Sequence, residues 1–232
     1  MRVEAHEADA ALLQMLEWFP GGIEQEDGPE GVVLSGYAEH SPADGLMEQD
    51  VEAGWETRWR QFHRPVRVGQ LWIGPPWSAS EEIAVVIDPG SAFGTGAHPS
   101  TRAALELLQR FAPQPLLDLG CGSGVLSIAA LKLGFSPVAA FDLDRLAVSA
   151  AADNAALNAV SFTVERADVL TDPLPPAPLW LANLQLDLIQ RLLERADLPE
   201  VVIVSGLLSS QSAGGQERVE IDGWAAEVIR TG

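Results

Sequence analysis

The chain has 232 residues, of which 47% are hydrophobic, so its length allows one large domain or two small domains with a packed core. Its 33 acidic residues outnumber its 14 basic residues and give a net charge of −19, which argues against nucleic acid as a partner because phosphate binding depends on clustered Lys and Arg. No apolar run is long enough to cross a bilayer and no signal-peptide core follows Met1, so we expect a soluble, cytoplasmic protein.

The first fifty residues predict a small separate α+β domain. Residues 2–5 are strand-like, and apolar side chains at helical spacing predict a helix over residues 7–19. Residues 23–26 and 32–37 flank a turn that contains glycine and proline, and they predict a β-hairpin. Strand, helix and hairpin are most of a ferredoxin-like α+β module, so we predict an N-terminal domain over residues 1–50.

Residues 51–68 are predicted to connect this domain to the rest of the chain. Within them, residues 54–63 predict a helix that carries Trp55 and Trp59 one turn apart on one face. We expect this pair to pack between the two parts of the protein. The second predicted domain then covers residues 69–232.

After a short separate strand expected at residues 71–73, predicted strands and helices alternate from residue 83 onward, which is typical of a parallel, doubly wound sheet. The expected strands of this alternation are residues 83–87, 116–119, 138–141, 162–166, 179–183 and 201–205, and the expected helices are residues 100–111, 125–133, 145–158 and 187–195. Ser100 is expected to cap the first of these helices. Residues 219–221 and 225–229 flank Asp222-Gly223 and predict an antiparallel hairpin at the end. Residues 209–216 are polar and contain glycine, which disfavours a helix.

The strongest sign of a ligand site is the segment LLDLGCGSG at residues 116–124. An apolar strand, three glycines at alternate positions and the start of a helix follow one another, so the backbone can approach a ligand and present its N–H groups. Asp142, at the tip of the next predicted strand, is placed to accept hydrogen bonds from ribose hydroxyls. The two features together predict an adenosine-containing cofactor.

The spacing and charge of the turn indicate which cofactor binds. Dinucleotide sites favour G-x-G-x-x-G, whereas this turn reads G-x-G-x-G and is opened by Asp118. A carboxylate suits a cationic ammonium or sulfonium group better than a pyrophosphate, so the prediction is S-adenosylmethionine. A glycine-rich turn without a ligand is the alternative. Cys121 lies inside the turn without a basic neighbour, so we expect it to pack rather than react; no metal site is expected.

A second glycine-rich segment, DPGSAFGTGAHPSTR at residues 88–102, lies between a predicted strand and a predicted helix. Such a loop can wrap a ligand with its backbone N–H groups, and Thr101 at the start of the helix offers a hydroxyl. Phe93 is placed either to lie against the adenine or to exclude solvent. His98 is more typical of a hydrogen-bonded structural residue than of a catalyst.

These segments together resemble the PrmA family, whose members methylate large-subunit ribosomal protein eleven. The resemblance is carried by AFGTGAHPSTR, by DLGCGSG followed by AALKLG, by the DLD pair at residues 142–144 and by Ala182-Asn183-Leu184, with further similarity in GWETRWR and LWI. It spans about residues 55–207 and implies the Rossmann-like fold of a class I methyltransferase. The acceptors that it implies are lysine side chains and the α-amino group of that ribosomal protein.

The resemblance also assigns roles to particular residues. It makes Thr101, Gly120, Asp142 and Asn183 contacts of S-adenosylmethionine, and Gly122 and Phe93 complete the predicted set. Asn183 is the predicted catalytic residue, because its amide can orient the incoming amine. The N-terminal domain is expected to recognise the substrate and to move relative to the catalytic domain, in a chain that is expected to be monomeric.

Three departures from the family pattern concern mainly the substrate side. Ser100 stands where the family usually has Thr, Leu186 stands where a small residue is expected, and residues 209–216 replace what should be a full helix. The substrate pocket is therefore the part of the site most open to change. The alternatives are a methyltransferase for another protein or a small-molecule amine, a non-catalytic module that binds S-adenosylmethionine, and a dehydrogenase-like protein that binds NAD.

Overall fold

The computed structural model divides into two compact units, Met1–Arg58 and Trp59–Gly232. It describes residues 2–3, 23–28, 31–36, 64–78, 83–88 and 96–231. The predicted helices over residues 7–19 and 54–63 lie outside these ranges, as do the side chains of Trp55 and Trp59, so they stay predictions. The domain boundaries placed at residues 50 and 68 also stay predictions.

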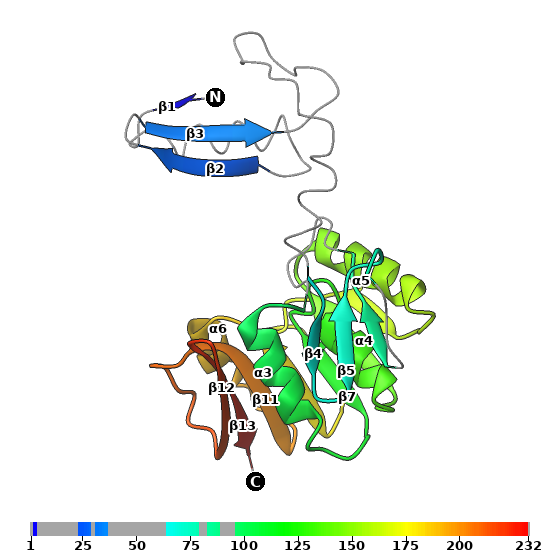
Figure 1. Ribbon diagram of the computed structural model, residues 1–232. Helices are drawn as coiled ribbons and strands as arrows, with labels where there is room; N and C mark the ends of the chain where they lie inside the picture. Colours follow the sequence, from blue (N-terminus) through cyan, green and yellow to red (C-terminus); the bar gives the residue numbers. More distant parts are fainter. Residues whose placement is uncertain are drawn as a thin grey trace. The chain divides into compact units, whose positions relative to one another are not determined.

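The described part of the N-terminal unit is a three-stranded antiparallel sheet in the order β1-β3-β2 (Figure 1). Its strands are β1 (Arg2–Val3), β2 (Ile23–Gly28) and β3 (Gly31–Gly36). The predicted hairpin is confirmed, since β2 and β3 pair around a turn between Gly28 and Gly31. β3 lies between β1 and β2, which is the order that a split β-α-β arrangement requires.

A seven-stranded sheet in the order β12-β13-β11-β10-β7-β8-β9 forms the centre of the second unit. Its strands are β7 (Leu116–Leu119), β8 (Val138–Asp142), β9 (Thr163–Arg166), β10 (Leu179–Asn183), β11 (Val201–Leu208), β12 (Glu217–Ile221) and β13 (Trp224–Arg230). The first five are parallel, whereas β13 runs antiparallel to both β11 and β12. The predicted parallel sheet with a C-terminal hairpin is confirmed.

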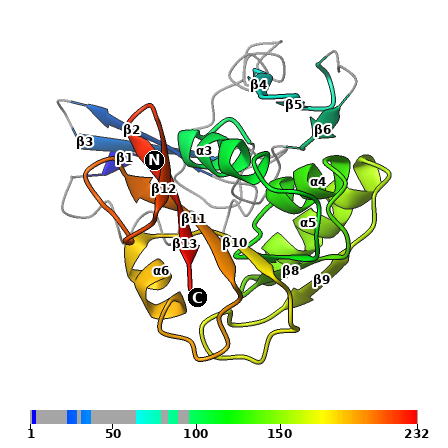
Figure 2. The same ribbon diagram turned by 90° about the horizontal axis from the view of Figure 1, so that it is seen from below.

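Helices cover both faces of this sheet (Figure 2). They are α3 (Pro99–Leu108), α4 (Val125–Lys132), α5 (Arg145–Leu157) and α6 (Leu186–Leu192). Alternate residues of a strand point to opposite faces, so Leu116 packs with α3 and α4 while Leu117 and Leu119 pack with α6. The sheet is thus buried on two sides, which explains why its strands read as continuous apolar runs.

The predicted strand at residues 83–87 is not part of this sheet. It forms β6 (Ala84–Val86), which pairs in parallel with β5 (Leu71–Gly74), and β5 pairs antiparallel with β4 (Val66–Val68). The expectation that residue 83 begins the central α/β alternation was therefore wrong. A short apolar run indicates burial but does not identify the strand beside it, and here Ile73 and Val85 join the core over α3 and α4.

The start of α3 also differs from the prediction. The cap is His98 and not Ser100, because the His98 side chain accepts a hydrogen bond from the Ser100 N–H at 3.3 Å. Pro99 occupies the first helical position, where its missing N–H costs nothing. Asp144 caps α5 by accepting from the Leu146 N–H at 2.9 Å, which agrees with the predicted helix start.

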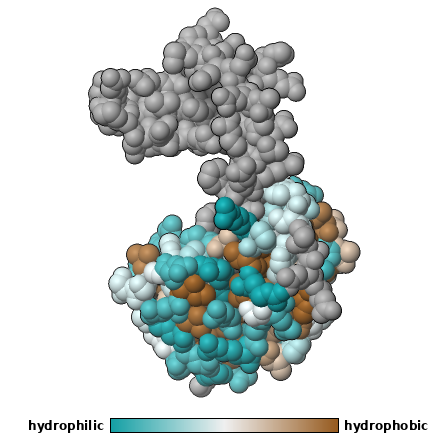
Figure 3. Space-filling model, in the orientation of Figure 1, coloured by the Kyte–Doolittle hydropathy of each residue, from teal (hydrophilic) through white to brown (hydrophobic). Residues whose placement is uncertain are grey.

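The C-terminal predictions are confirmed. Asp222 and Gly223 both have positive φ angles, 47° and 82°, as a two-residue hairpin turn requires. Residues 209–216 form no helix between β11 and β12. In the face drawn in Figure 3, the described surface is mostly hydrophilic with separate hydrophobic patches. Within the described ranges, no helix has the length and apolar character needed to span a bilayer.

Candidate active site

The glycine turn directly follows β7 and leads into α4. Gly120, Gly122 and Gly124 all have positive φ angles, 78°, 52° and 79°. The Gly120 N–H donates to the Phe141 carbonyl at 2.8 Å, which fixes the start of the turn against the end of β8. A Cβ atom on Gly120 would lie 2.5 Å from Cδ2 of Leu184, and the positive φ would itself strain any other residue, so the position favours glycine.

Asp142 stands at the end of β8, beside this turn. Its Oδ2 accepts from the Gly122 N–H at 2.9 Å, and its Oδ1 accepts from the Asp144 N–H at 3.0 Å. The carboxylate is therefore fixed in direction without being buried completely. Gly122 and Asp142 are twenty positions apart in the sequence, and both were predicted to bind the cofactor. The structure thus places them in direct contact.

Asn183 and Thr101 form the second pair. Asn183 ends β10 and stays partly exposed, and its amide nitrogen donates to the Thr101 hydroxyl at 3.2 Å. Thr101 is buried in the first turn of α3. Leu184, the residue after Asn183, is the one that faces Gly120, so both pairs lie at the carboxyl ends of the neighbouring strands β7, β8 and β10. Ligands of open α/β sheets bind at this edge.

Asp118 lies on the α4 face of β7 and is completely buried. The Ser127 hydroxyl donates to its Oδ2 at 2.6 Å, whereas its Oδ1 has no hydrogen-bond partner among the described residues. Burial raises the pKa of this carboxyl to about 7; the bonds from Ser127 oppose the rise, and the Asp142 charge adds to it. A cation at the glycine turn would stabilise the ionised form of Asp118. The carboxyl therefore still favours a cationic ligand, because it loses its proton when such a ligand binds.

The sequence analysis missed two buried asparagines, Asn154 in α5 and Asn158 at its C-cap. Asn154 joins Asp88, the first residue of the segment DPGSAFGTGAHPSTR at residues 88–102, to the glycine turn. Asn154 donates to the Ser123 carbonyl at 2.9 Å and accepts from the Asp88 N–H at 3.0 Å. Asn158 accepts from the Val86 N–H at 2.8 Å and donates to the carbonyl of the same residue. Asp88 is the last described residue before residue 96, so one end of this segment is anchored to the turn.

The other end of the segment is anchored as well. Gly96 has a φ of 85°, and a Cβ atom there would lie 2.4 Å from Ile73 and 3.3 Å from Val125, the first residue of α4. Residues 89–95, and with them the predicted contact Phe93, lie outside the described ranges. Nothing in the local pattern around Asn154 signals this role, since an NxxxN spacing on a helix is also typical of an exposed face.

His98 and Cys121 have the structural surroundings expected of packing residues. Burial, together with the nearby positive charge of Arg102, lowers the pKa of His98, so the ring is neutral at pH 7. Besides capping α3, His98 contacts the Trp224 ring at a centroid distance of 4.6 Å. Burial raises the pKa of the Cys121 thiol far above neutrality, and the side chain packs with Ala140 and Ala151.

Comparison with known proteins identifies the family. The family model described as Ribosomal protein L11 methyltransferase (PrmA) matches residues 35–231. The chain belongs to this family. The resemblance read from AFGTGAHPSTR and DLGCGSG is therefore confirmed.

Individual relatives agree with this assignment. The chain is 39% identical over 195 residues to the Ribosomal protein L11 methyltransferase of Synechococcus sp.. The aligned region covers 76% of this chain and 65% of the relative. It is 36% identical to that of Geobacter metallireducens, over 82% of this chain and 65% of the relative. The chain thus spans less than two thirds of the length of these relatives.

A solved structure described as ribosomal protein L11 methylase, from Lactobacillus delbrueckii subsp. bulgaricus, superimposes with a TM-score of 0.66 at 27% identity. The match covers 72% of this chain and 99% of that chain. The class I methyltransferase fold expected from the sequence is therefore confirmed.

The buried Asp118 leads to a pH-dependent prediction. Its pKa is about 7 in the folded chain and near 4 in an unfolded chain, so the folded state binds this proton more tightly. The free energy of unfolding should therefore fall as pH rises from about 4 to about 7, by at most about 1.4 kcal/mol per pH unit from this group. In Asp118→Asn this contribution is absent. Urea unfolding of both proteins at several pH values measures the difference, and parallel curves would contradict the assignment.

The Asn154 bridge leads to a second prediction. Asn154→Ala leaves the Asp88 N–H and the Ser123 carbonyl without this partner, which should lower the free energy of unfolding by about 1–3 kcal/mol. Hydrogen exchange at the Asp88 amide should accelerate at the same time. Asp153→Ala, at the exposed neighbouring position, is the matched control and should change neither quantity. Unchanged exchange at Asp88 in Asn154→Ala would contradict the bridging role.

Proposed function

We propose that the chain is a methyltransferase that transfers methyl groups from S-adenosylmethionine to amino groups of ribosomal protein L11. Membership of the PrmA family and the printed names of its relatives support this proposal. The observation that carries it is the Asp142 carboxylate, which is fixed by the Gly122 N–H at the end of β8 beside a G-x-G-x-G turn. This is the arrangement that a ribose diol and a small cationic group need.

The residues of the site fit this cofactor. The turn at Gly120 and Gly122 would hold its methionyl part, the Asp142 carboxylate would accept from its ribose hydroxyls, and Thr101 would offer a hydroxyl nearby. Asp118 fits as well, because its buried Oδ1 lacks a hydrogen-bond partner in the described structure and a nearby cation would stabilise its ionised form. Phe93 remains a predicted contact on the adenine side.

Orientation of the amine is the main task left to the protein. The bound cofactor supplies a methyl group already activated by a sulfonium, so the acceptor nitrogen must be held in line with it and must be unprotonated. The Thr101 hydroxyl occupies the amide nitrogen of Asn183, which leaves the amide oxygen to accept from the amine. Desolvation close to a positive charge lowers the pKa of the amine and favours its neutral form.

Cofactor binding is tested by calorimetry with S-adenosylmethionine and with NAD. We expect binding of the former only, and tight binding of NAD alone would favour a dehydrogenase-like protein instead. Asp142→Ala should weaken binding of S-adenosylmethionine by about 1–3 kcal/mol, or roughly 5- to 150-fold, because a charged acceptor is lost. Asp153→Ala removes the same charge from an exposed position of α5 and should leave binding unchanged.

The acceptor is tested by mass spectrometry of purified ribosomal protein L11 after incubation with the chain and S-adenosylmethionine. Methylation of lysine and α-amino groups is expected. Cofactor binding without methylation would favour the alternatives, an enzyme for another protein or small-molecule amine, or a non-catalytic binding module.

We further propose that the N-terminal unit recognises the substrate. A shortened chain that begins near Val51 should then bind S-adenosylmethionine but fail to methylate L11. Equal methylation by both chains would contradict this role. A monomeric state and the absence of a nucleic-acid partner stay predictions of the sequence.

A further inference from the structure

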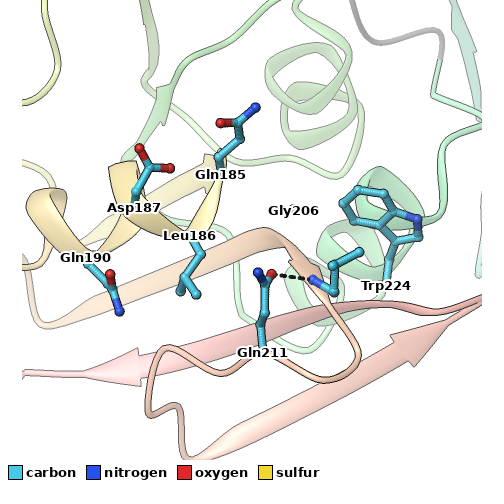
Figure 4. Close-up of a pocket in the computed structure, with 8 residues that line it drawn as sticks. Gln185, Leu186, Asp187, Gln190, Gly206, Gln211 and Trp224 are labelled. Carbon is cyan, nitrogen blue, oxygen red and sulfur yellow. Dashed lines mark hydrogen bonds between the residues drawn. The ribbon is translucent and has the colours of Figure 1, made fainter.

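A pocket of about 450 Å³ lies at the carboxyl ends of β10 and β11, next to the candidate active site. It is lined from the first turn of α6, from the end of β11 and the loop that follows, and from the start of β13. Figure 4 shows Gln185, the N-cap of α6, with Leu186 and Asp187 of that helix on one side and Trp224 on the other, and Gly206 and Gln211 between them.

Gly206 connects this pocket to Asn183. It has a φ of 91°, and a Cβ atom on it would lie 2.2 Å from the Leu184 carbonyl oxygen and 3.1 Å from Oδ1 of Asn183. The amide oxygen that the proposed function assigns to the acceptor amine therefore lies against a residue of the pocket lining. Leu184 also faces Gly120. Residues 183 and 184 therefore lie next to both the glycine turn, at Gly120, and the pocket lining, at Gly206.

The described walls of the pocket combine apolar surface with a single charge. Leu186 and Trp224 line it, as does Leu208, which is 44% exposed although it is a large hydrophobic residue. Among the described residues of the lining, Asp187 is the one that carries a charge. A ligand with an aliphatic stem and a cationic end matches this combination, because carboxylates and indole rings both attract cations.

The loop at residues 209–216, which contributes Gln211 to the pocket, is held by an ion pair between a buried glutamate and a partly exposed arginine. Glu227 is buried and pairs with Arg218, and it also accepts from the N–H groups of Ala213 and Gly215 at 2.8 and 3.0 Å. Arg218 in turn donates to the carbonyl of Gln211 at 2.9 Å. Burial raises the pKa of Glu227, but the hydrogen bonds from these groups outweigh it and lower the pKa overall. Glu227 is therefore ionised at neutral pH and can accept all of these hydrogen bonds.

The side chains at the two ends of the pocket are held as well. Gln211 accepts from the Leu208 N–H at 2.8 Å, which fixes the direction of its amide (Figure 4). The Trp224 ring packs edge to face with His98, whose side chain caps α3. The pocket is therefore formed before a ligand arrives, which lowers the entropic cost of binding.

We propose that this pocket receives the lysine side chain that is to be methylated, with its methylene groups between Leu186 and Trp224. Asp187 attracts the ammonium group as it enters, and the ammonium releases its proton to solvent before its nitrogen lies at the Asn183 amide oxygen, because only the neutral amine accepts the methyl group. The proposal rests on the proposed function, since it names the part of the site that receives the acceptor. The same walls suit the methylated product, which keeps its positive charge. The acidic net charge of the chain, −19, favours the approach of such a cationic group.

Steady-state kinetics with ribosomal protein L11 provides the first test. Trp224→Ala should raise KM for L11 roughly 2- to 30-fold. Asp187→Asn should raise it roughly two- to five-fold at low salt, because an exposed carboxylate is screened. The dissociation constant of S-adenosylmethionine should stay unchanged in both. Asp153→Asn is the charge-matched control. A parallel loss of cofactor affinity in Trp224→Ala would assign the effect to the His98 cap of α3 and would overturn the proposal.

Direct binding provides a second test that needs no activity. The probes are N-acetyl-lysine amide and N-acetyl-norleucine amide, which share a four-carbon stem but differ in the terminal amine. In the ¹⁵N-labelled full chain, the indole N–H resonance of Trp224, identified by its absence in Trp224→Phe, should shift with the lysine compound at much lower concentration than with the norleucine compound. Equal shifts, or none, would overturn the assignment.

The two tests separate the pocket from the reaction. If the wild-type chain binds no S-adenosylmethionine and leaves L11 unmodified, the proposed function fails, and the resonance of Trp224 still decides whether the pocket binds an amine. If L11 is methylated with unchanged KM in Asp187→Asn and Trp224→Ala, the function stands and the pocket assignment is wrong.

Discussion

Replacing Asn183 with alanine is expected to lower the turnover number for methylation of L11 roughly 100-fold, while the dissociation constant of S-adenosylmethionine changes by less than about five-fold. The reason is that an amide does not titrate near neutral pH, so Asn183 acts by orienting the amine, and loss of one positioned group at a reacting centre typically costs about 100-fold or more. Single-turnover kinetics and calorimetry on the same preparations measure the two quantities.

Thr101 supplies the control for this prediction. The Thr101 hydroxyl holds the Asn183 amide at 3.2 Å, so Thr101→Val should reproduce part of the loss of turnover, whereas Thr101→Ser keeps the hydroxyl and should retain most of the activity. Equal losses of turnover and of cofactor affinity in Asn183→Ala would recast this residue as a plain cofactor contact.

Replacing Gly206 with alanine is expected to cause a large loss of stability. The residue has a φ of 91°, and the added Cβ would lie 2.2 Å from a backbone carbonyl oxygen that cannot move as a side chain can. The strained backbone costs about 1–2 kcal/mol and the overpacking about 1–3 kcal/mol, so the free energy of unfolding should fall by roughly 2–5 kcal/mol. Urea unfolding measures this quantity.

Gly214 offers a matched control in the same unit. Its φ of 87° is almost the same, but a Cβ atom there meets nothing within 4 Å. Gly214→Ala should therefore show the backbone cost alone, about 1 kcal/mol after the lower entropy of the unfolded chain is included. If the two variants lose the same stability, the close approach of Gly206 to Leu184 is not what requires glycine at this position.

The sequence alone determined the parts of the site that depend on neighbours along the chain. The glycine turn after β7, the carboxylate at the end of β8 and the two-residue hairpin turn at Asp222-Gly223 each need particular residue types at fixed spacing, because left-handed backbone and a close ligand demand glycine. The burial of the central sheet on both faces was likewise visible in the sequence, as continuous apolar runs in its strands. These local requirements are also why the family was recognisable.

Only the tertiary structure decided which distant groups meet. The pairing of β6 with β5, the Asn183–Thr101 contact and the Asn154 bridge join residues that are 12 to 82 positions apart, and nothing in a local pattern specifies such partners. The raised pKa of Asp118 has the same origin, since it follows from burial beneath α4 and not from its neighbours in the chain. The pocket between α6 and β13 exists because packing brings Gly206 against Asn183, and packing is a property of the folded chain as a whole.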